Sequence, residues 1–284
     1  MSGTTTETAY RLDEEVRREL DAYYEQVVTE DDQPVDNLFS AKQQTLLKRP
    51  LYASWTPPAG KHQTPGQKRA FLADSDIGVF FAIDRPPRAP DFFLSLDVRP
   101  RDDWYEKRNR SYFVWEFGKP PDVVVEIVSN TEGGELDRKL DDYAEMGARY
   151  YVVFDPQRKL KEMEGQVLQV YELSGLHYRL RDDAALPDLG LSLTFWPGVF
   201  EGKEDTWLRW CDDQGAVIPT GEERAAREAA RADQEAARAN QEVARADQEV
   251  VVRQQAEERA RIEAERAARL AEKLRELGVD PEQE

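Results

Sequence analysis

The sequence predicts an α/β (α+β) domain with a mixed central sheet flanked by helices, followed by one long C-terminal helix. From Ile77 onward, short apolar runs alternate with turn residues, and one amphipathic helical pattern interrupts them. Beyond Gly221 the composition changes to Ala, Arg, Glu and Gln. The 284 residues suffice for one domain of about 200 residues with a sizeable core, plus an appendage.

Two helices are expected before the first strand. Asp13 is a suitable N-cap for a helix through Glu25, in which apolar residues recur at helical spacing. A second helical pattern covers residues 35–47, and the Pro- and Gly-containing segment 57–68 is expected to be a loop. Residues 1–10 are Thr-rich and are expected to be disordered.

Short apolar runs bounded by turn residues predict the strands. The run 123–129 is apolar nearly throughout, which is typical of a strand covered on both faces. One helix, at residues 135–146, begins after Gly133-Gly134 and ends at Gly147. Strands are expected at residues 77–83, 92–98, 112–115, 123–129, 150–154, 167–173, 177–180 and 189–195.

Residues 221–278 are expected to form one long helix that ends at Gly278, with 279–284 as a tail. The heptads ARADQEA, ARANQEV and ARADQEV follow one another and place Val243 and Val250 on one seam. Because the other seam residues are small alanines, two interpretations stay open. The helix either pairs as a coiled coil or stands alone in solvent, held by Arg/Glu pairs.

Composition excludes several kinds of site. The single cysteine, Cys211, rules out an intrachain disulfide and a zinc site built from cysteines. Two histidines, His62 and His177, are too few for HExxH metalloproteases, histidine-rich phosphodiesterases or His-Asn-His nucleases. The N-terminus has no basic n-region, and no run approaches the ~18 apolar residues of a membrane span. We therefore expect a soluble, cytoplasmic protein without a membrane partner.

The net charge of −18 extends over both the domain and the helix. This charge opposes the counterion-release attraction to nucleic acids, so DNA binding would need a local basic surface. Residues 99–110, RPRDDWYEKRNR, carry five basic against three acidic residues and are a candidate DNA-facing loop. An ordinary solvated loop is the alternative. Residues 60–68, GKHQTPGQK, lack the glycine spacing of a phosphate loop, so no nucleotide cofactor is predicted.

Two carboxylates stand out by their positions. Glu126 lies in the middle of an apolar strand, where an ionised carboxylate needs a cation, a hydrogen-bond network or a metal. Its alternative is a structural pair with Arg or Lys. Asp91 follows Pro90 and opens the preceding strand, and two acids on adjacent strands can share a hard cation. Its alternative is a turn residue.

Lys139 is the third candidate. It borders the buried stripe of the helix 135–146, which includes Tyr143. Because helical side chains lean toward the N-terminus, this helix could aim Lys139 back at the two carboxylates. The alternative is a surface lysine paired with Asp142 or Glu135.

The order of these residues resembles the PD-(D/E)XK nuclease superfamily and, more closely, the Uma-type endonuclease family of restriction endonuclease domains. The resemblance covers about residues 30–210 and the tail LRELGVDPE. Val128 stands where the general motif has its lysine, and Lys139 would be the migrated replacement. The matching segments are Pro90-Asp91 with FFLSL, VVVEIVSNT, and DRKLDDYAEMGARYYVVFDP with its Lys-x3-Tyr-x3-Gly-x3-Tyr spacing.

The resemblance implies a restriction-endonuclease-like core over residues 11–212 and a Mg²⁺-dependent DNA endonuclease, with Mn²⁺ as a second candidate ion. It implies that Asp91, Glu126 and Lys139 are catalytic, with Asp91 and Glu126 as metal ligands. The Ile127 carbonyl would be a further ligand, and Asp76 either an extra ligand or a structural residue. A homodimer, formed through the C-terminal helix, would suit cleavage of two strands. The alternative is an inactive nuclease-like scaffold whose C-terminal helix mediates oligomerisation or partner binding.

Overall fold

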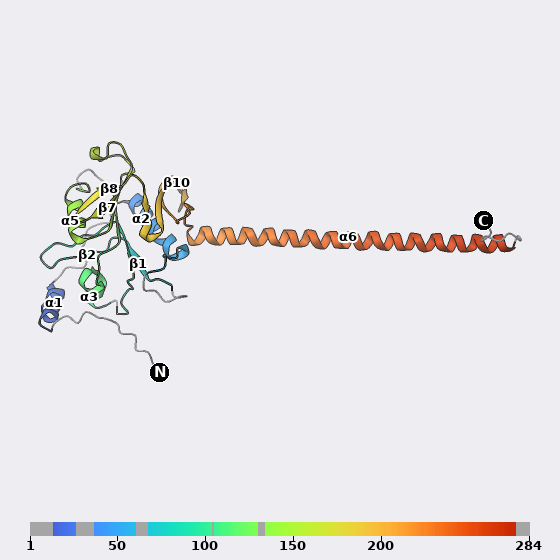
Figure 1. Cartoon of the computed structure of the whole chain (residues 1–284), viewed down its shortest axis with the longest axis horizontal. Helices are drawn as coiled ribbons and strands as arrows, with labels where there is room; N and C mark the ends of the chain where they lie inside the picture. The colour runs from blue at the N-terminus through green and yellow to red at the C-terminus, as the bar shows by residue number, and fades with distance from the viewer. Residues whose placement is uncertain (1–13, 27–36, 61–67, 104, 130–133, 277–284) are drawn as a thin grey trace. The chain divides into compact units, whose positions relative to one another are not determined.

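The computed structural model describes residues 14–26, 37–60, 68–103, 105–129 and 134–276. The expectations for residues 1–10 and 279–284, for the Asp13 cap and for His62 fall outside these ranges. The chain divides into two compact units, Met1–Gly221 and Glu222–Glu284 (Figure 1). The first unit confirms the predicted class, because it is a mixed sheet flanked by helices.

A six-stranded sheet in the order β1-β3-β5-β6-β7-β8 forms the centre of this unit. Strands β5 (Val123–Ile127) and β6 (Tyr150–Phe154) run parallel, and the other neighbouring strands are antiparallel. Every residue of β5 and β6 is buried, as their continuous apolar sequences predict. The remaining strands are β1 (Phe71–Asp74), β3 (Phe92–Leu96), β7 (Leu168–Ser174) and β8 (His177–Leu180).

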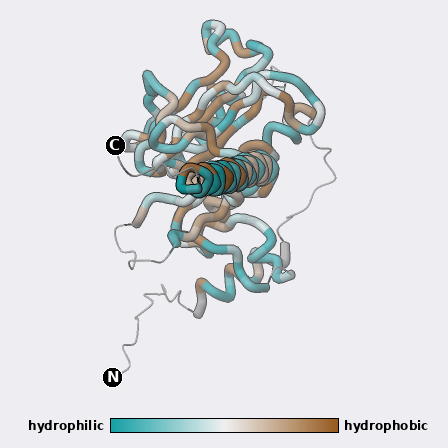
Figure 2. Tube along the Cα trace, turned by 90° about the vertical axis from the view of Figure 1, so that its right-hand side faces the viewer, coloured by the Kyte–Doolittle hydropathy of each residue, from teal (hydrophilic) through white to brown (hydrophobic). Residues whose placement is uncertain are grey.

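One face of the sheet packs against helix α2 and a smaller three-stranded sheet, in the order β11-β10-β9. The side-chain amide of Gln43 on α2 bonds both the N–H and the carbonyl of Leu208, at 2.9 and 2.8 Å, which joins the helix to β11. Brown, apolar segments run through this unit in Figure 2. The elements are α2 (Leu38–Ser54), β9 (Ala185–Leu186), β10 (Leu191–Phe200) and β11 (Lys203–Cys211).

The opposite face packs against α5 (Arg138–Met146), whose Tyr143 joins a buried cluster with Phe93 and Val124. A smaller cluster around Phe80 links α1 to the parallel pair β2 and β4. The remaining elements are α1 (Glu14–Gln26), β2 (Val79–Phe80), α3 (Lys107–Arg110), β4 (Tyr112–Phe113), α4 (Val114–Phe117), η1 (Lys161–Met163) and η2 (Pro187–Leu189).

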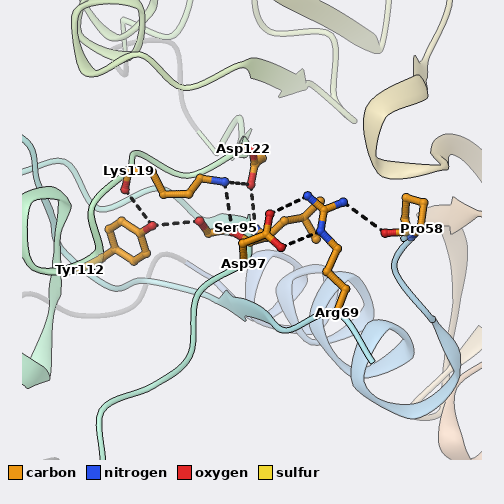
Figure 3. Close-up of polar contacts among 8 residues, drawn as sticks. Pro58, Arg69, Ser95, Asp97, Tyr112, Lys119 and Asp122 are labelled. Atoms are coloured by element: carbon orange, nitrogen blue, oxygen red, sulfur yellow. Dashed lines mark hydrogen bonds and ion pairs between the residues drawn. The ribbon is translucent and has the colours of Figure 1, made fainter. Parts of the chain in front are cut away.

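A polar network fixes the end of β3 to the start of β5 (Figure 3). The carboxylate of Asp122 accepts from the Leu96 N–H at 2.7 Å and from the Lys119 ammonium at 2.5 Å. Arg69 forms two bonds to Asp97, at 2.8 and 2.6 Å. These contacts hold the register in which Phe92 pairs with Val125, and this register places the candidate carboxylates at the other end of the pair.

Several element boundaries differ from the sequence prediction. Helix α2 continues past Leu47 to Ser54 although it contains Pro50, because Leu51 is fully buried in the core and tertiary packing outweighs propensity. Segment 112–115 splits into the short strand β4 and the turn of helix α4, and segment 77–83 contains only β2.

Three strands, β1, β9 and β11, were not predicted, and β9 is only two residues long. The sequence of β1, FLAD, is short and half-buried, so it shows no clear period. Strand β11 begins with the exposed residues KEDT and pairs along its length with β10, which extends to Phe200. The hairpin turn uses Glu201 and Gly202 at φ values of 46° and 75°, a conformation that favours glycine.

Helix α6 (Gly221–Glu276) begins at the last residue of the first unit and forms the described part of the second (Figure 1). None of its residues is buried, and Figure 2 shows teal and brown residues mixed along it. Pairs such as Arg231–Glu235 and Arg253–Glu257 connect successive turns on its surface. Among the described helices, none is both long and apolar enough to cross a membrane.

Candidate active site

Strands β3 and β5 bring Asp91 and Glu126 together. Asp91 directly precedes β3, and continuing the pairing of Phe92 with Val125 places Asp91 opposite Glu126. Opposed residues of an antiparallel pair project from the same face, which here is the face covered by α5. The Ile127 N–H donates to Asp91 Oδ2 at 2.5 Å, so the β5 backbone fixes this carboxylate.

Helix α5 supplies the groups that contact Glu126. Lys139 Nζ donates to Oε2 at 2.8 Å, and the Tyr143 hydroxyl donates to Oε1 at 2.5 Å. The two donors are four residues apart, so they lie on one side of the helix. The structure therefore brings together all three residues that the sequence singled out, although Val128 remains a buried apolar residue.

Sequence reasoning missed Gln44 of α2. Its side-chain amide donates to Asp91 Oδ1 at 3.3 Å and to Asp76 Oδ1 at 3.0 Å. Asp76 thereby becomes a neighbour of Asp91, and its backbone N–H also donates to the Pro90 carbonyl at 3.2 Å. No local pattern could reveal Gln44, because it reaches the site from a distant helix.

Glu135, which precedes α5, is the other additional member. Its Oε1 lies 3.4 Å from Lys139 Nζ, and its backbone carbonyl accepts from the Tyr151 hydroxyl at 2.8 Å. The four-residue spacing to Lys139 is the sequence signal for this pair. Lys139 thus contacts two carboxylates, one inside the sheet and one just before its own helix.

The site holds more buried negative than positive charge. Asp91, Glu126 and Glu135 are only 7%, 3% and 5% exposed, and Lys139 is the cation that contacts the latter two. Burial, together with the charge of Glu126, raises the pKa of Asp91 to about 8. Burial also raises the pKa of Glu126, although Lys139 and Tyr143 oppose this effect. For Lys139, burial lowers the pKa, but the charge of Glu126 and the other carboxylates leaves it above its usual value.

These residues fit a divalent cation. Carboxylate oxygens are hard ligands, and a cation would offset the surplus negative charge. Within the described residues, no group of three or more His, Cys, Asp or Glu side chains is arranged to hold a metal ion. A site with two carboxylates suits Mg²⁺, which usually keeps several water ligands and binds one or two protein carboxylates.

The basic loop is partly engaged by intramolecular contacts. The guanidinium of Arg108 pairs with Glu106 at 2.5 Å, and that of Arg101 donates to the Glu116 carbonyl at 2.5 Å. The side chain of Arg108 is still 41% exposed and that of Arg101 is 49% exposed. The arginines therefore remain accessible on the surface around α3.

Comparison with known proteins agrees with this arrangement. Residues 41–195 match the model of the Uma2 family, described as "Putative restriction endonuclease". The matched segment is more than half of the chain and includes Asp91, Glu126 and Lys139. A search of the curated proteins gave no match. The resemblance inferred from the sequence motifs is confirmed, and the chain belongs to the Uma2 family of nuclease-like proteins.

Proposed function

We propose that the protein is a divalent-metal-dependent endonuclease that hydrolyses phosphodiester bonds in DNA. The observation that carries the proposal is the convergence of Asp91, Glu126 and Lys139 on one face of the sheet. Membership of the Uma2 family supports the nuclease chemistry. Mg²⁺ is the first candidate ion and Mn²⁺ the second, since both prefer oxygen ligands.

Asp91 and Glu126 would hold the cation, which supplies Lewis acidity to activate water and to stabilise charge on the phosphate. The chain fixes both carboxylates in advance. The Ile127 N–H and Gln44 orient Asp91, whereas Tyr143 orients Glu126. Pre-organised ligands lose little freedom on binding, which favours a defined position for the ion.

Lys139 would act as a cation. Its raised pKa keeps the amine protonated near neutral pH, so it is a hydrogen-bond donor and a poor general base. Its side chain is 24% exposed, whereas that of Glu126 is 4% exposed. The ammonium can therefore meet solvent or a phosphate while it still contacts the buried carboxylate.

The exposed arginines around α3 are our candidate for DNA contact. The local sequence KRNR places three basic residues on four positions of a chain whose net charge is −18. Such a cluster supplies the local positive surface that a phosphate backbone requires.

We also propose that two copies of the chain pair through α6. Val243 and Val250 are 60% and 53% exposed and are seven residues apart, which is the spacing of a coiled-coil seam. Pairing would bury this seam and supply two active sites for the two strands of DNA.

Plasmid cleavage tests the function directly. Wild-type protein with Mg²⁺ or Mn²⁺ should convert supercoiled plasmid to nicked and linear forms. Asp91→Asn, Glu126→Gln and Lys139→Met should each reduce the rate by at least ~100-fold. Glu145→Gln on α5 is the matched control, because Glu145 is exposed and pairs with Arg85 outside the site. Equal cleavage by the three site variants would overturn the proposal.

A further inference from the structure

Both candidate metal ligands already accept hydrogen bonds on every carboxylate oxygen. Tyr143 and Lys139 donate to the two oxygens of Glu126, and Gln44 and the Ile127 N–H donate to those of Asp91. Of these four donors, Lys139 alone carries a positive charge. A divalent cation that binds Glu126 therefore repels the Lys139 ammonium and competes with it for Oε2.

Glu135 offers the ammonium a second partner. Its side chain is 6% exposed, and its Oε1 is 3.4 Å from Lys139 Nζ, a distance that leaves this contact weak. The other oxygen, Oε2, is buried and accepts no hydrogen bond from the described residues. A buried carboxylate oxygen without a donor is costly, so this oxygen needs a partner in some other state.

We propose that Glu135 is a positioning residue that takes over the Lys139 ammonium when a divalent cation occupies Asp91 and Glu126. The inference rests on the proposed function, since it requires the cation. The ammonium already contacts both carboxylates, so the exchange needs only a closer approach to Glu135. Glu135 itself is held by the Tyr151 hydroxyl on its backbone carbonyl. Lys139 thus stays beside the site with its charge balanced.

A double-mutant cycle separates this role from a general effect of charge. Mg²⁺ affinity is measured by calorimetry for wild type, Glu135→Gln, Lys139→Met and the double variant. Glu135→Gln should weaken Mg²⁺ binding about tenfold, because Lys139 then has no second carboxylate and competes more strongly for Glu126. In the Lys139→Met background the same substitution should change the affinity less than about twofold. Glu145→Gln is the matched control and should bind Mg²⁺ like wild type.

An equal loss of affinity in both backgrounds would make Glu135 a source of general negative charge and overturn the inference. An unchanged affinity in Glu135→Gln would overturn it as well. The wild-type titration separates these outcomes from failure of the function, because absence of Mg²⁺ binding in wild type would remove both proposals. Far-ultraviolet circular dichroism checks that each variant is folded.

A second measurement needs no substitution at Glu135. The ¹⁵N signal of the Lys139 ammonium, assigned with Lys139→Met, is followed during Mg²⁺ titration of the wild type. The signal should move with Mg²⁺ occupancy, since the ammonium passes from one carboxylate to the other. A signal that does not move at Mg²⁺ saturation would contradict the inference.

Discussion

Glu126 is the central residue of the site, because the charge of a carboxylate in a fully buried strand must be compensated. Two donors from α5 compensate it, one charged and one neutral. Asp91, in contrast, is contacted by neutral donors, a backbone N–H and an amide. Because neither of these donors is charged, the pKa of Asp91 remains sensitive to the charge of Glu126.

The first prediction concerns stability in the absence of metal. The pKa of Asp91 is about 8 in the folded protein and 3.8 for an ordinary Asp, so the folded state holds a proton that the unfolded state has lost. The stability from Asp91 is therefore fully present below about pH 4 and is lost as pH rises toward 8. Asp91→Asn removes this loss, because the amide stays neutral.

The variant should therefore melt at a higher temperature than wild type at pH 8 in EDTA, by about 2–4 °C for each kcal/mol relieved. The difference should shrink at pH 5, where the wild-type carboxyl is protonated in the folded state. Thermal melting at both pH values checks this. A variant that is less stable at pH 8 would show that an ionised Asp91 is not penalised.

The second prediction concerns Tyr143, which positions Glu126. Tyr143→Phe removes the 2.5 Å hydrogen bond and leaves Oε1 without that donor, which should lower the free energy of unfolding by about 1–3 kcal/mol. Plasmid cleavage should fall about tenfold, because Glu126 is less firmly oriented. Urea unfolding and initial cleavage rates measure the two effects. Tyr171→Phe on β7 is the control, because among the described contacts the Tyr171 hydroxyl bonds only Gln169. This variant should retain full cleavage activity. An equal loss of activity in Tyr171→Phe would argue against a specific role for Tyr143.

At the site, spacing along one helix was readable from the sequence and contacts between elements were not. Lys139 and Tyr143 follow from the helical period, once Glu126 is recognised as a buried acid in a strand. Glu135 could be seen only as one alternative partner of Lys139. Gln44 lies 47 positions before Asp91, and its role depends on how α2 packs on the sheet.

At the scale of the elements, the centre of the sheet was predictable and its periphery was not. Strands β5 and β6 are apolar throughout apart from Glu126, and their sequences specify burial on both faces. The edge strand β1 and the hairpin strand β11 are stabilised by pairing with neighbours, which the local sequence does not encode. Helix α2 was predicted too short for the same reason, because packing of Leu51 overrides Pro50.

The third prediction belongs to the loop that carries α3. Arg108→Gln with Arg110→Gln should weaken DNA binding and lower the slope of log affinity against log salt by about 0.9 for each phosphate that the loop no longer neutralises. Fluorescence anisotropy with a labelled duplex, in the Glu126→Gln background, measures the slope. Arg231→Gln with Arg253→Gln on α6 removes the same charge elsewhere and should leave the slope nearly unchanged. An unaltered slope in the loop variant would exclude this loop from the DNA interface.

At the scale of the whole molecule, Val243 and Val250 form a seam on α6 that is exposed in the single chain. The fourth prediction is that the wild type is a dimer of two 32.7 kDa chains and that Val243→Glu with Val250→Glu makes it a monomer. Gln241→Glu with Gln248→Glu adds the same charge on the opposite side of the helix, and this variant should remain dimeric. Sedimentation equilibrium gives the masses. A monomeric wild type would contradict pairing through α6.

Calorimetric titration of Mg²⁺ into metal-free wild type and Glu126→Gln shows whether Asp91 and Glu126 hold a cation, with which every proposed catalytic role begins. Glutamine preserves the size of the side chain and a carbonyl oxygen for Tyr143, so the variant should remain folded. We expect saturable Mg²⁺ binding by wild type and by the Glu145→Gln control, and loss of this binding in Glu126→Gln. Equal Mg²⁺ binding by all three proteins, or no binding by the wild type, would make Glu126 a structural carboxylate and exclude the proposed metal site.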